Sequence, residues 1–258
     1  MSIKVITACT DEKFYFPHLK KTCEANGGDF VVLGMGEKWG GYIWKFNKMI
    51  DYLKELEKNE IVCFVDGYDV ICVKNLENIK EKFVKFSKEK NCKVIIGKDN
   101  NSFFPEFMRK LYFGELPINS GTYIGRVCDI LHILSTSRTM FPDIIDDQIL
   151  IIKYAEKFRD QIYIDEDYDF FYVYMFPFTE SDIKGTPYFA HAPGCSLLNN
   201  ILGLEESERN RINNDLKHLM IKKASYHGYE MLKKSFVLVM ILVVLLMIFI
   251  YLNKRRRN

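Results

Sequence analysis

The sequence lacks the patterns that mark several large classes of protein. None of its seven cysteines forms a Cys-x-x-Cys pair, which argues against a zinc site. Its 36 Lys and Arg residues barely exceed its 34 Asp and Glu residues, so no basic surface and no nucleic-acid partner are expected. Internal repeats and low-complexity segments are also absent from the sequence, so nothing interrupts a single folded domain.

Apolar residues, in contrast, are plentiful enough for one large core. The 258 residues are 48% hydrophobic and 14% aromatic, which is typical of one good-sized globular domain. Several cysteines lie inside apolar runs, as small core residues do, and a reducing compartment is expected. The N-terminus has no basic segment followed by an apolar one, so we expect no signal peptide.

The C-terminal region contains one uncharged apolar run without Gly or Pro, FVLVMILVVLLMIFIYL at 236–252. As a helix it would be about 25 Å long, near the lower limit for crossing a bilayer. We expect a transmembrane helix at 235–253 that forms a single-pass C-terminal anchor, between a polar and basic linker helix at 205–234 and a basic tail at 254–258. The alternative is a buried core helix. Because no signal peptide is expected, we predict that the preceding domain faces the cytosol.

Strands and helices alternate along the predicted domain, residues 1–204. We expect strands at 3–8, 30–33, 61–65, 93–96, 161–165 and 187–192, and helices at 13–25, 42–56, 76–86, 104–113 and 146–158. This alternation predicts an α/β domain with a mostly parallel open sheet flanked by helices on both faces.

Two acids, Asp66 and Asp69, follow directly after the apolar strand at 61–65, in the segment FVDGYDV. Ligands of open parallel sheets bind beyond the carboxyl ends of the strands. Two acids there repel each other unless a cation lies between them, and their hard oxygen atoms suit magnesium or manganese. Gly67 lets a backbone or a phosphate approach closely. The alternative is a turn that holds both acids in water.

One histidine, His191 in the segment FAHAPG, also follows a predicted strand. An imidazole at a strand end could reach across the sheet and complete a site begun by the two aspartates. The alternative is a purely structural histidine. The other four histidines lie in helical or linker segments and show no comparable pattern.

Six short motifs occur in the order VITACT, LGMGEKW, FVDGYDV, INSGTYIG, DDQ and HAPGCSLLNNILG, between residues 3 and 203. Together they resemble the glycosyltransferase domain of the procollagen lysyl hydroxylases and the related collagen galactosyl- and glucosyltransferases. The resemblance implies a GT-A-like fold that uses a UDP-sugar and Mn²⁺ (or Mg²⁺). It also implies that Asp66, Asp69 and His191 are the metal ligands.

The same resemblance implies where the donor binds. Thr10, Trp39 and Tyr68 match residues that hold the uridine, and Lys45 matches a lysine near the diphosphate. Trp39 offers a flat face for uracil, or it caps the core; Tyr68 lies against the base, or it fills the core. Lys45 could instead be an ordinary surface lysine. Gly194 lies in a turn expected at the diphosphate, but Pro193 there removes a backbone donor of the family pattern.

Six residues match the sugar and acceptor side of the family: Asn119, Ser120, Gly121, Asp146, Asp147 and Gln148. Asp146 or Asp147 would orient the sugar or accept the proton of the acceptor. The alternative is that the two acids only stabilise the start of a helix.

The predicted activity is metal-dependent transfer of a hexose, glucose or galactose, from a UDP-sugar to a hydroxyl acceptor, such as hydroxylysine or a glycan on a protein. One alternative is a catalytically inactive, membrane-anchored relative that binds a nucleotide sugar or a carbohydrate. Another is a metal-dependent phosphohydrolase. That enzyme class needs its second acid two residues after the first, whereas Asp66 and Asp69 are three apart.

Overall fold

The computed structural model describes residues 2–100, 110, 113–174, 183–193 and 198–216. The chain divides into two compact units, Met1–Asn213 and Asn214–Asn258, and the fold described below is that of the first unit.

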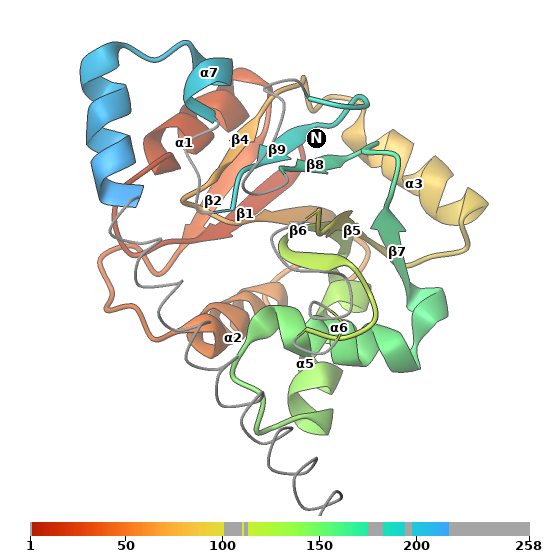
Figure 1. The fold of residues 1–258 in the computed structure, drawn as a ribbon. Helices are drawn as coiled ribbons and strands as arrows, with labels where there is room; N and C mark the ends of the chain where they lie inside the picture. The colour runs from red at the N-terminus through yellow and green to blue at the C-terminus, as the bar shows by residue number, and fades with distance from the viewer. Residues whose placement is uncertain (1, 101–109, 111–112, 175–182, 194–197, 217–258) are drawn as a thin grey trace, which may run out of the picture. The chain divides into compact units, whose positions relative to one another are not determined.

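A six-stranded sheet in the order β2-β1-β3-β6-β5-β7 forms the centre of this unit (Figure 1). Its strands are β1 (Lys4–Ala8), β2 (Asp29–Leu33), β3 (Ile61–Val65), β5 (Val94–Lys98), β6 (Ile118–Arg126) and β7 (Ile162–Asp165). β1 is parallel to β2 and β3, and β5 is parallel to β7, whereas β6 is antiparallel to β3 and β5. The predicted α/β class and open sheet are confirmed, but the sheet is mixed.

The reversed strand β6 is the element of this sheet that the sequence pattern did not predict. Its sequence, INSGTYIGR, interrupts the apolar residues with Asn, Ser and Gly, which are poor strand formers. Strand pairing along both edges and burial stabilise it nevertheless, because all of its residues except the last are buried. The low strand propensity is therefore offset by the position of the segment at the centre of the sheet.

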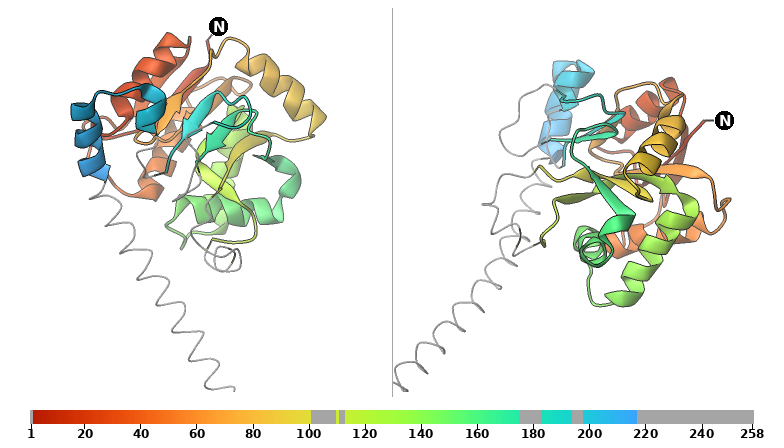
Figure 2. Two further views of the ribbon diagram at one scale, coloured as in Figure 1. Left: turned by 45° about the horizontal axis from the view of Figure 1, so that its top comes forward. Right: turned by 90° about the vertical axis from the view of Figure 1, so that its right-hand side faces the viewer.

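Helices cover both faces of the large sheet (Figure 2). One face carries α2 (Tyr42–Leu53), α5 (Val127–Met140) and α6 (Asp147–Lys157), and the other carries α1 (Phe16–Ala25) and α3 (Ile79–Glu89). Neighbouring residues of one strand accordingly enter different hydrophobic cores. Ile6 packs in the core on the α2 side, and Val5 packs in the core on the α1 side.

A second, three-stranded sheet lies on the α1 and α3 side, in the order β4-β9-β8. Its strands are β4 (Val70–Cys72), β8 (Phe171–Val173) and β9 (Phe189–His191). β9 is antiparallel to β4 and parallel to β8, so that His191 is paired with Val70 and Val173. The described residues also include a 3-10 turn, Arg159–Gln161, and a short helix, α7 (Leu198–Leu202).

Several predicted bounds differ from those of the structure. α1 begins at Phe16 instead of residue 13, because Phe14 has a positive φ of 51° that no α-helix contains. α3 lies three residues later than predicted at both ends, and α5 was not predicted. Most of the helix predicted at 104–113 lies outside the described residues.

The predicted linker and membrane segments are described only in part. Residues 206–216 are helical, and the rest of the predicted linker at 205–234 lies outside the described residues. The predicted membrane helix at 235–253 and the basic tail at 254–258 lie outside them entirely. Within the described part of the chain, no helix combines the length and the apolar character needed to cross a bilayer.

Candidate metal centre

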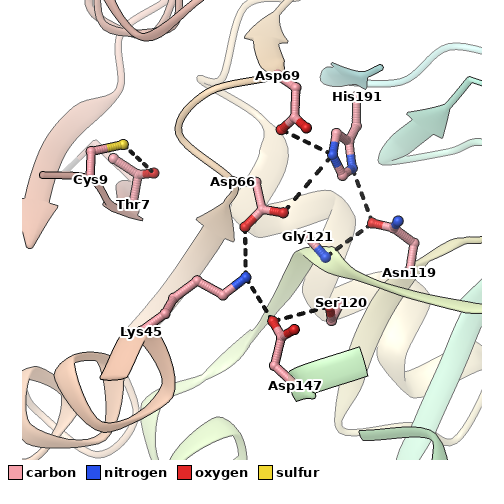
Figure 3. A network of polar contacts seen from close by, with 10 residues as sticks. All are labelled: Thr7, Cys9, Lys45, Asp66, Asp69, Asn119, Ser120, Gly121, Asp147 and His191. Carbon is pink, nitrogen blue, oxygen red and sulfur yellow. Dashed lines mark hydrogen bonds and ion pairs between the residues drawn. The ribbon is translucent and has the colours of Figure 1, made fainter. Parts of the chain in front are cut away.

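Three of the predicted site residues meet where the two sheets come together. Asp66 directly follows β3, Asp69 directly precedes β4, and His191 ends β9 (Figure 3). The Nε2 atom of His191 lies 3.2 Å from Oδ1 of Asp69 and 4.0 Å from Oδ2 of Asp66. One ligand atom from each residue can be chosen so that all three atoms lie within 4.8 Å of one another.

The two distances from Nε2 of His191 fit ligands of one divalent ion, and the upper limit of 4.8 Å among the three atoms is close to the range for such an ion. Two ligands that each lie about 2.1 Å from an octahedral ion are roughly 3 to 4.2 Å apart, depending on the angle between them. His191 is 2% exposed, yet its Nε2 has no hydrogen-bond partner in the part of the chain that is described. A buried nitrogen without a partner is costly. A metal ion at this point would satisfy it, and the donor set of two carboxylates and one imidazole suits manganese or magnesium.

Two glycines permit the close packing of this centre. A side chain at Gly121 would overlap both the imidazole of His191 and the carboxylate of Asp66. A side chain at Gly67 would overlap the sulfur of Cys9 at the end of β1. Gly67 was predicted to allow close approach of a backbone or phosphate, and in the structure it allows the loop of the two acids to pack on β1.

Lys45 on α2 connects the metal centre to Asp147. Its Nζ atom lies 2.9 Å from Oδ1 of Asp66 and 2.7 Å from Oδ2 of Asp147, and Ser120 donates a hydrogen bond of 3.2 Å to the same Asp147 oxygen. Lys45 is buried, so the alternative of an ordinary surface lysine is wrong. Burial alone would lower its pKa, but the carboxylates of Asp147 and Asp66 outweigh this effect and hold the pKa well above its usual value. The side chain is therefore an ammonium ion.

The two adjacent acids at the start of α6 have different roles. Asp146 is the N-cap residue, and its side chain accepts a hydrogen bond of 3.0 Å from the backbone nitrogen of Ile149. Burial and the charge of Asp147 raise the pKa of Asp146. Asp147 is buried and points to Lys45 and Ser120 (Figure 3). The helix-start interpretation therefore describes Asp146, and Asp147 belongs to the polar network.

The residues predicted to hold the uridine lie on the loops after β1, β2 and β3. Tyr68 is half-buried; its hydroxyl accepts a hydrogen bond of 3.1 Å from the backbone nitrogen of Thr10 and donates one of 2.9 Å to Asp11. Trp39 is 43% exposed and lies edge to face with Trp44, at a centroid distance of 5.2 Å. The structure thus joins Thr10 to Tyr68 and leaves nearly half of the Trp39 side chain exposed.

Of the remaining predicted residues, Asn119 contacts a proposed metal ligand and Gln148 lies elsewhere on α6. The side-chain oxygen of Asn119 lies 3.0 Å from Nδ1 of His191, a contact that the sequence did not indicate because 72 positions separate the two residues. Gln148 on α6 contacts the carboxylate of Asp99 at 3.5 Å. Gly194 lies outside the described residues.

Comparison with known proteins supports the resemblance seen in the motifs. The family model of the PLOD glycosyltransferase (GT) domain matches residues 1–174. A multifunctional procollagen lysine hydroxylase and glycosyltransferase of Caenorhabditis elegans is 26% identical over 180 residues, which are 63% of this chain and 24% of the relative. A procollagen-lysine,2-oxoglutarate 5-dioxygenase of Drosophila melanogaster is 29% identical over 169 residues, which are 58% of this chain and 22% of the relative.

The chain therefore spans about a quarter of the length of the curated relatives it matches. Among solved structures, it is similar to a glycosyltransferase involved in the glycosylation of the major capsid of PBCV-1. That similarity has a TM-score of 0.48 at 12% sequence identity and covers 79% of this chain and 98% of the other. Because the family model covers more than half of the sequence, the chain belongs to the PLOD GT domain family.

Proposed function

We propose that this protein is a GT-A-type glycosyltransferase that transfers a hexose, glucose or galactose, from a UDP-sugar to a hydroxyl group of a protein or glycan, such as hydroxylysine. The observation that carries the proposal is the buried Nε2 of His191, which lies 3.2 Å from Asp69 and has no hydrogen-bond partner in the described residues. Nε2 of His191 and the carboxylates of Asp66 and Asp69 would together hold Mn²⁺ or Mg²⁺. The bound ion would act as a Lewis acid and stabilise the charge that develops on the departing UDP.

The donor would lie between the metal centre and the loops after β1, β2 and β3. The 43% exposure of Trp39 supports stacking of the uracil on its ring, because base–aromatic stacking needs an accessible side chain. Tyr68 and Thr10 hold each other by hydrogen bonds and would border the uridine. Lys45 would supply positive charge near the diphosphate, and its ion pairs with Asp66 and Asp147 keep it there before the donor binds.

Asp147 is the residue proposed to act at the acceptor. It is buried, ionically paired with Lys45 and hydrogen-bonded to Ser120, so its carboxylate is fixed in place. A fixed carboxylate can orient the sugar or accept the proton of the attacking hydroxyl. Asp146 is engaged at the helix N-terminus and would support Asp147 through the position of α6.

A test of the metal assignment is release of UDP from a panel of UDP-sugars with added Mn²⁺ and a hydroxylysine-containing peptide. Asp69→Asn is expected to reduce activity by at least a hundredfold, because the ion loses a charged ligand. Glu166→Gln is the control, since Glu166 is an exposed acid outside the centre. Equal activity of Asp69→Asn and the wild type would remove the metal assignment. Binding of UDP without any turnover would show a catalytically inactive relative.

We also propose that residues 235–253 anchor this domain to a membrane, with the domain on the cytosolic side. The uncharged apolar run and the basic residues on both sides of it support this proposal. Protease treatment of intact membranes tests it, because a cytosolic domain would be digested without detergent. Protection of the domain until detergent is added would contradict the cytosolic orientation of the domain.

A further inference from the structure

The imidazole of His191 has a different neighbour on each of its nitrogen atoms. Nε2 faces the carboxylates of Asp66 and Asp69, at 4.0 and 3.2 Å. Nδ1 lies 3.0 Å from the side-chain oxygen of Asn119 (Figure 3). Both Asn119 and His191 are buried, so water competes little for this contact.

The chemistry of Asn119 decides which nitrogen of His191 carries a proton. The backbone nitrogen of Gly121 donates a hydrogen bond of 3.0 Å to the Asn119 oxygen, and a backbone N–H can only donate. This contact fixes the amide so that oxygen, and not nitrogen, points to this side. The same oxygen faces Nδ1 of His191, and an oxygen acceptor requires a donor opposite it. Nδ1 must therefore carry the proton.

The backbone around Asn119 holds this arrangement in place. Asn119 is paired with Gly97 while Tyr123 is paired with Ile96, so a β-bulge sets residues 120–122 of β6 out of register with β5. The carbonyl oxygen of Gly121, at this bulge, accepts a hydrogen bond of 2.7 Å from the nitrogen of Asp66. The bulge thus ties Asn119 to the segment that carries one of the acids.

We propose that Asn119 is a positioning residue for the metal centre: its side-chain oxygen keeps the proton of His191 on Nδ1 and so leaves Nε2 free to bind a divalent ion. The proposal rests on the proposed function only for the identity of that ion. Without Asn119, a neutral imidazole could carry its proton on Nε2, the nitrogen that faces the carboxylates of Asp69 and Asp66 at 3.2 and 4.0 Å. That form would occupy the position of the metal–nitrogen bond and compete with the ion.

Removal of the Asn119 oxygen should therefore weaken metal binding. Asn119→Leu has a similar volume and no acceptor, and we expect its affinity for Mn²⁺ to fall about 10- to 100-fold. Asn119→Asp keeps an oxygen for Nδ1 and for Gly121, so we expect it to bind Mn²⁺ at least as well as the wild type. Thr122→Val is the matched control, because Thr122 is buried on the same strand and its hydroxyl has no partner in the described residues.

Two measurements on the full chain test this proposal. The first is titration with Mn²⁺ alone, with free Mn²⁺ followed by electron paramagnetic resonance. The second is ¹⁵N-histidine NMR of the metal-free protein, with His191 assigned from a His191→Gln spectrum, which shows the nitrogen that carries the proton. We expect a protonated Nδ1 in the wild type and in Asn119→Asp, and a bare Nδ1 with a proton on Nε2 in Asn119→Leu.

A bare Nδ1 in the wild type, or unchanged Mn²⁺ affinity in Asn119→Leu, would overturn the proposal. Should Asn119→Leu fail to fold, the wild-type spectrum decides the question by itself. If the wild type binds no Mn²⁺, the proposed function loses its metal, and the NMR spectra still decide whether Asn119 controls the proton of His191. The failure of one proposal is therefore distinguishable from the failure of the other.

Discussion

Replacement of Lys45 by Met would remove the ammonium ion that lies between two carboxylates and keep most of the side-chain volume. The Lys45 and Asp147 side chains are 8% and 6% exposed and their charged atoms are 2.7 Å apart, so this ion pair is almost fully desolvated. The side chain of Asp66, the second partner at 2.9 Å, is 28% exposed and can be solvated by water. The substitution therefore leaves mainly Asp147 as a buried charge without its cation.

The size of the effect follows from this difference in burial. Loss of one partner of a buried ion pair costs about 3 to 5 kcal/mol of folding free energy, because the other charge stays buried. The pair with the more exposed Asp66 contributes less than about 1 kcal/mol. The hydroxyl of Ser120 still donates to Asp147 and offsets part of the loss. We therefore expect Lys45→Met to lower the free energy of unfolding by about 3 to 4 kcal/mol.

Urea unfolding followed by far-ultraviolet circular dichroism measures this change. Lys48→Met is the control, because Lys48 lies on the same helix with 34% of its side chain exposed and pairs with Glu37 at the surface. Its loss should cost less than about 1 kcal/mol. Adding Asp147→Asn to Lys45→Met should restore part of the stability, since the buried charge is gone. A Lys45→Met protein as stable as Lys48→Met would refute the reasoning.

Three further perturbations have distinct expected outcomes. Gly121→Ala places a methyl group against His191 and Asp66. The affinity for Mn²⁺ should therefore fall at least tenfold in a titration followed by electron paramagnetic resonance. Unchanged affinity would contradict the close packing at Gly121. Trp39→Ala should weaken UDP binding by about 1 to 3 kcal/mol in calorimetry, because the uracil would lose its stacking partner. The same substitution should change the free energy of unfolding by less than about 0.5 kcal/mol, because Trp39 is 43% exposed. Asp165→Asn should lower the free energy of unfolding in urea by about 1 to 3 kcal/mol, because the carboxylate accepts three backbone hydrogen bonds; no change would show that these bonds add little.

Local sequence patterns were sufficient for much of the fold. The strand at 61–65 is found at the predicted residues, because an uninterrupted apolar run is buried on both faces. β6 could not be predicted in the same way, since its Asn, Ser and Gly residues lower the strand propensity that the pattern measures. Its stability comes from pairing with β3 and β5, which is a property of the assembled sheet. The antiparallel strand was missed for this reason.

The candidate site shows the same division between local and long-range information. The two acids after β3 were visible as a break in an apolar run, and His191 as a polar residue at a strand end. The burial of Lys45 was not visible, because the acid that compensates its charge, Asp147, follows 102 positions later. The contact of Asn119 with His191 likewise joins distant segments. Partners of this kind are set by tertiary structure, and local periodicity contains no information about them.

The division of the metal ligands between the two sheets sets a lower limit on the piece of chain that could bind the ion. All six strands of the large sheet end before residue 174, where the family match also ends. His191 comes later, on β9, and pairs there with β4. A chain shortened to residue 174 would keep both acids and the six strands of the large sheet in its sequence, yet lack the nitrogen ligand and the strand that pairs with β4. The metal centre therefore needs more of the chain than the residues that the family model matches.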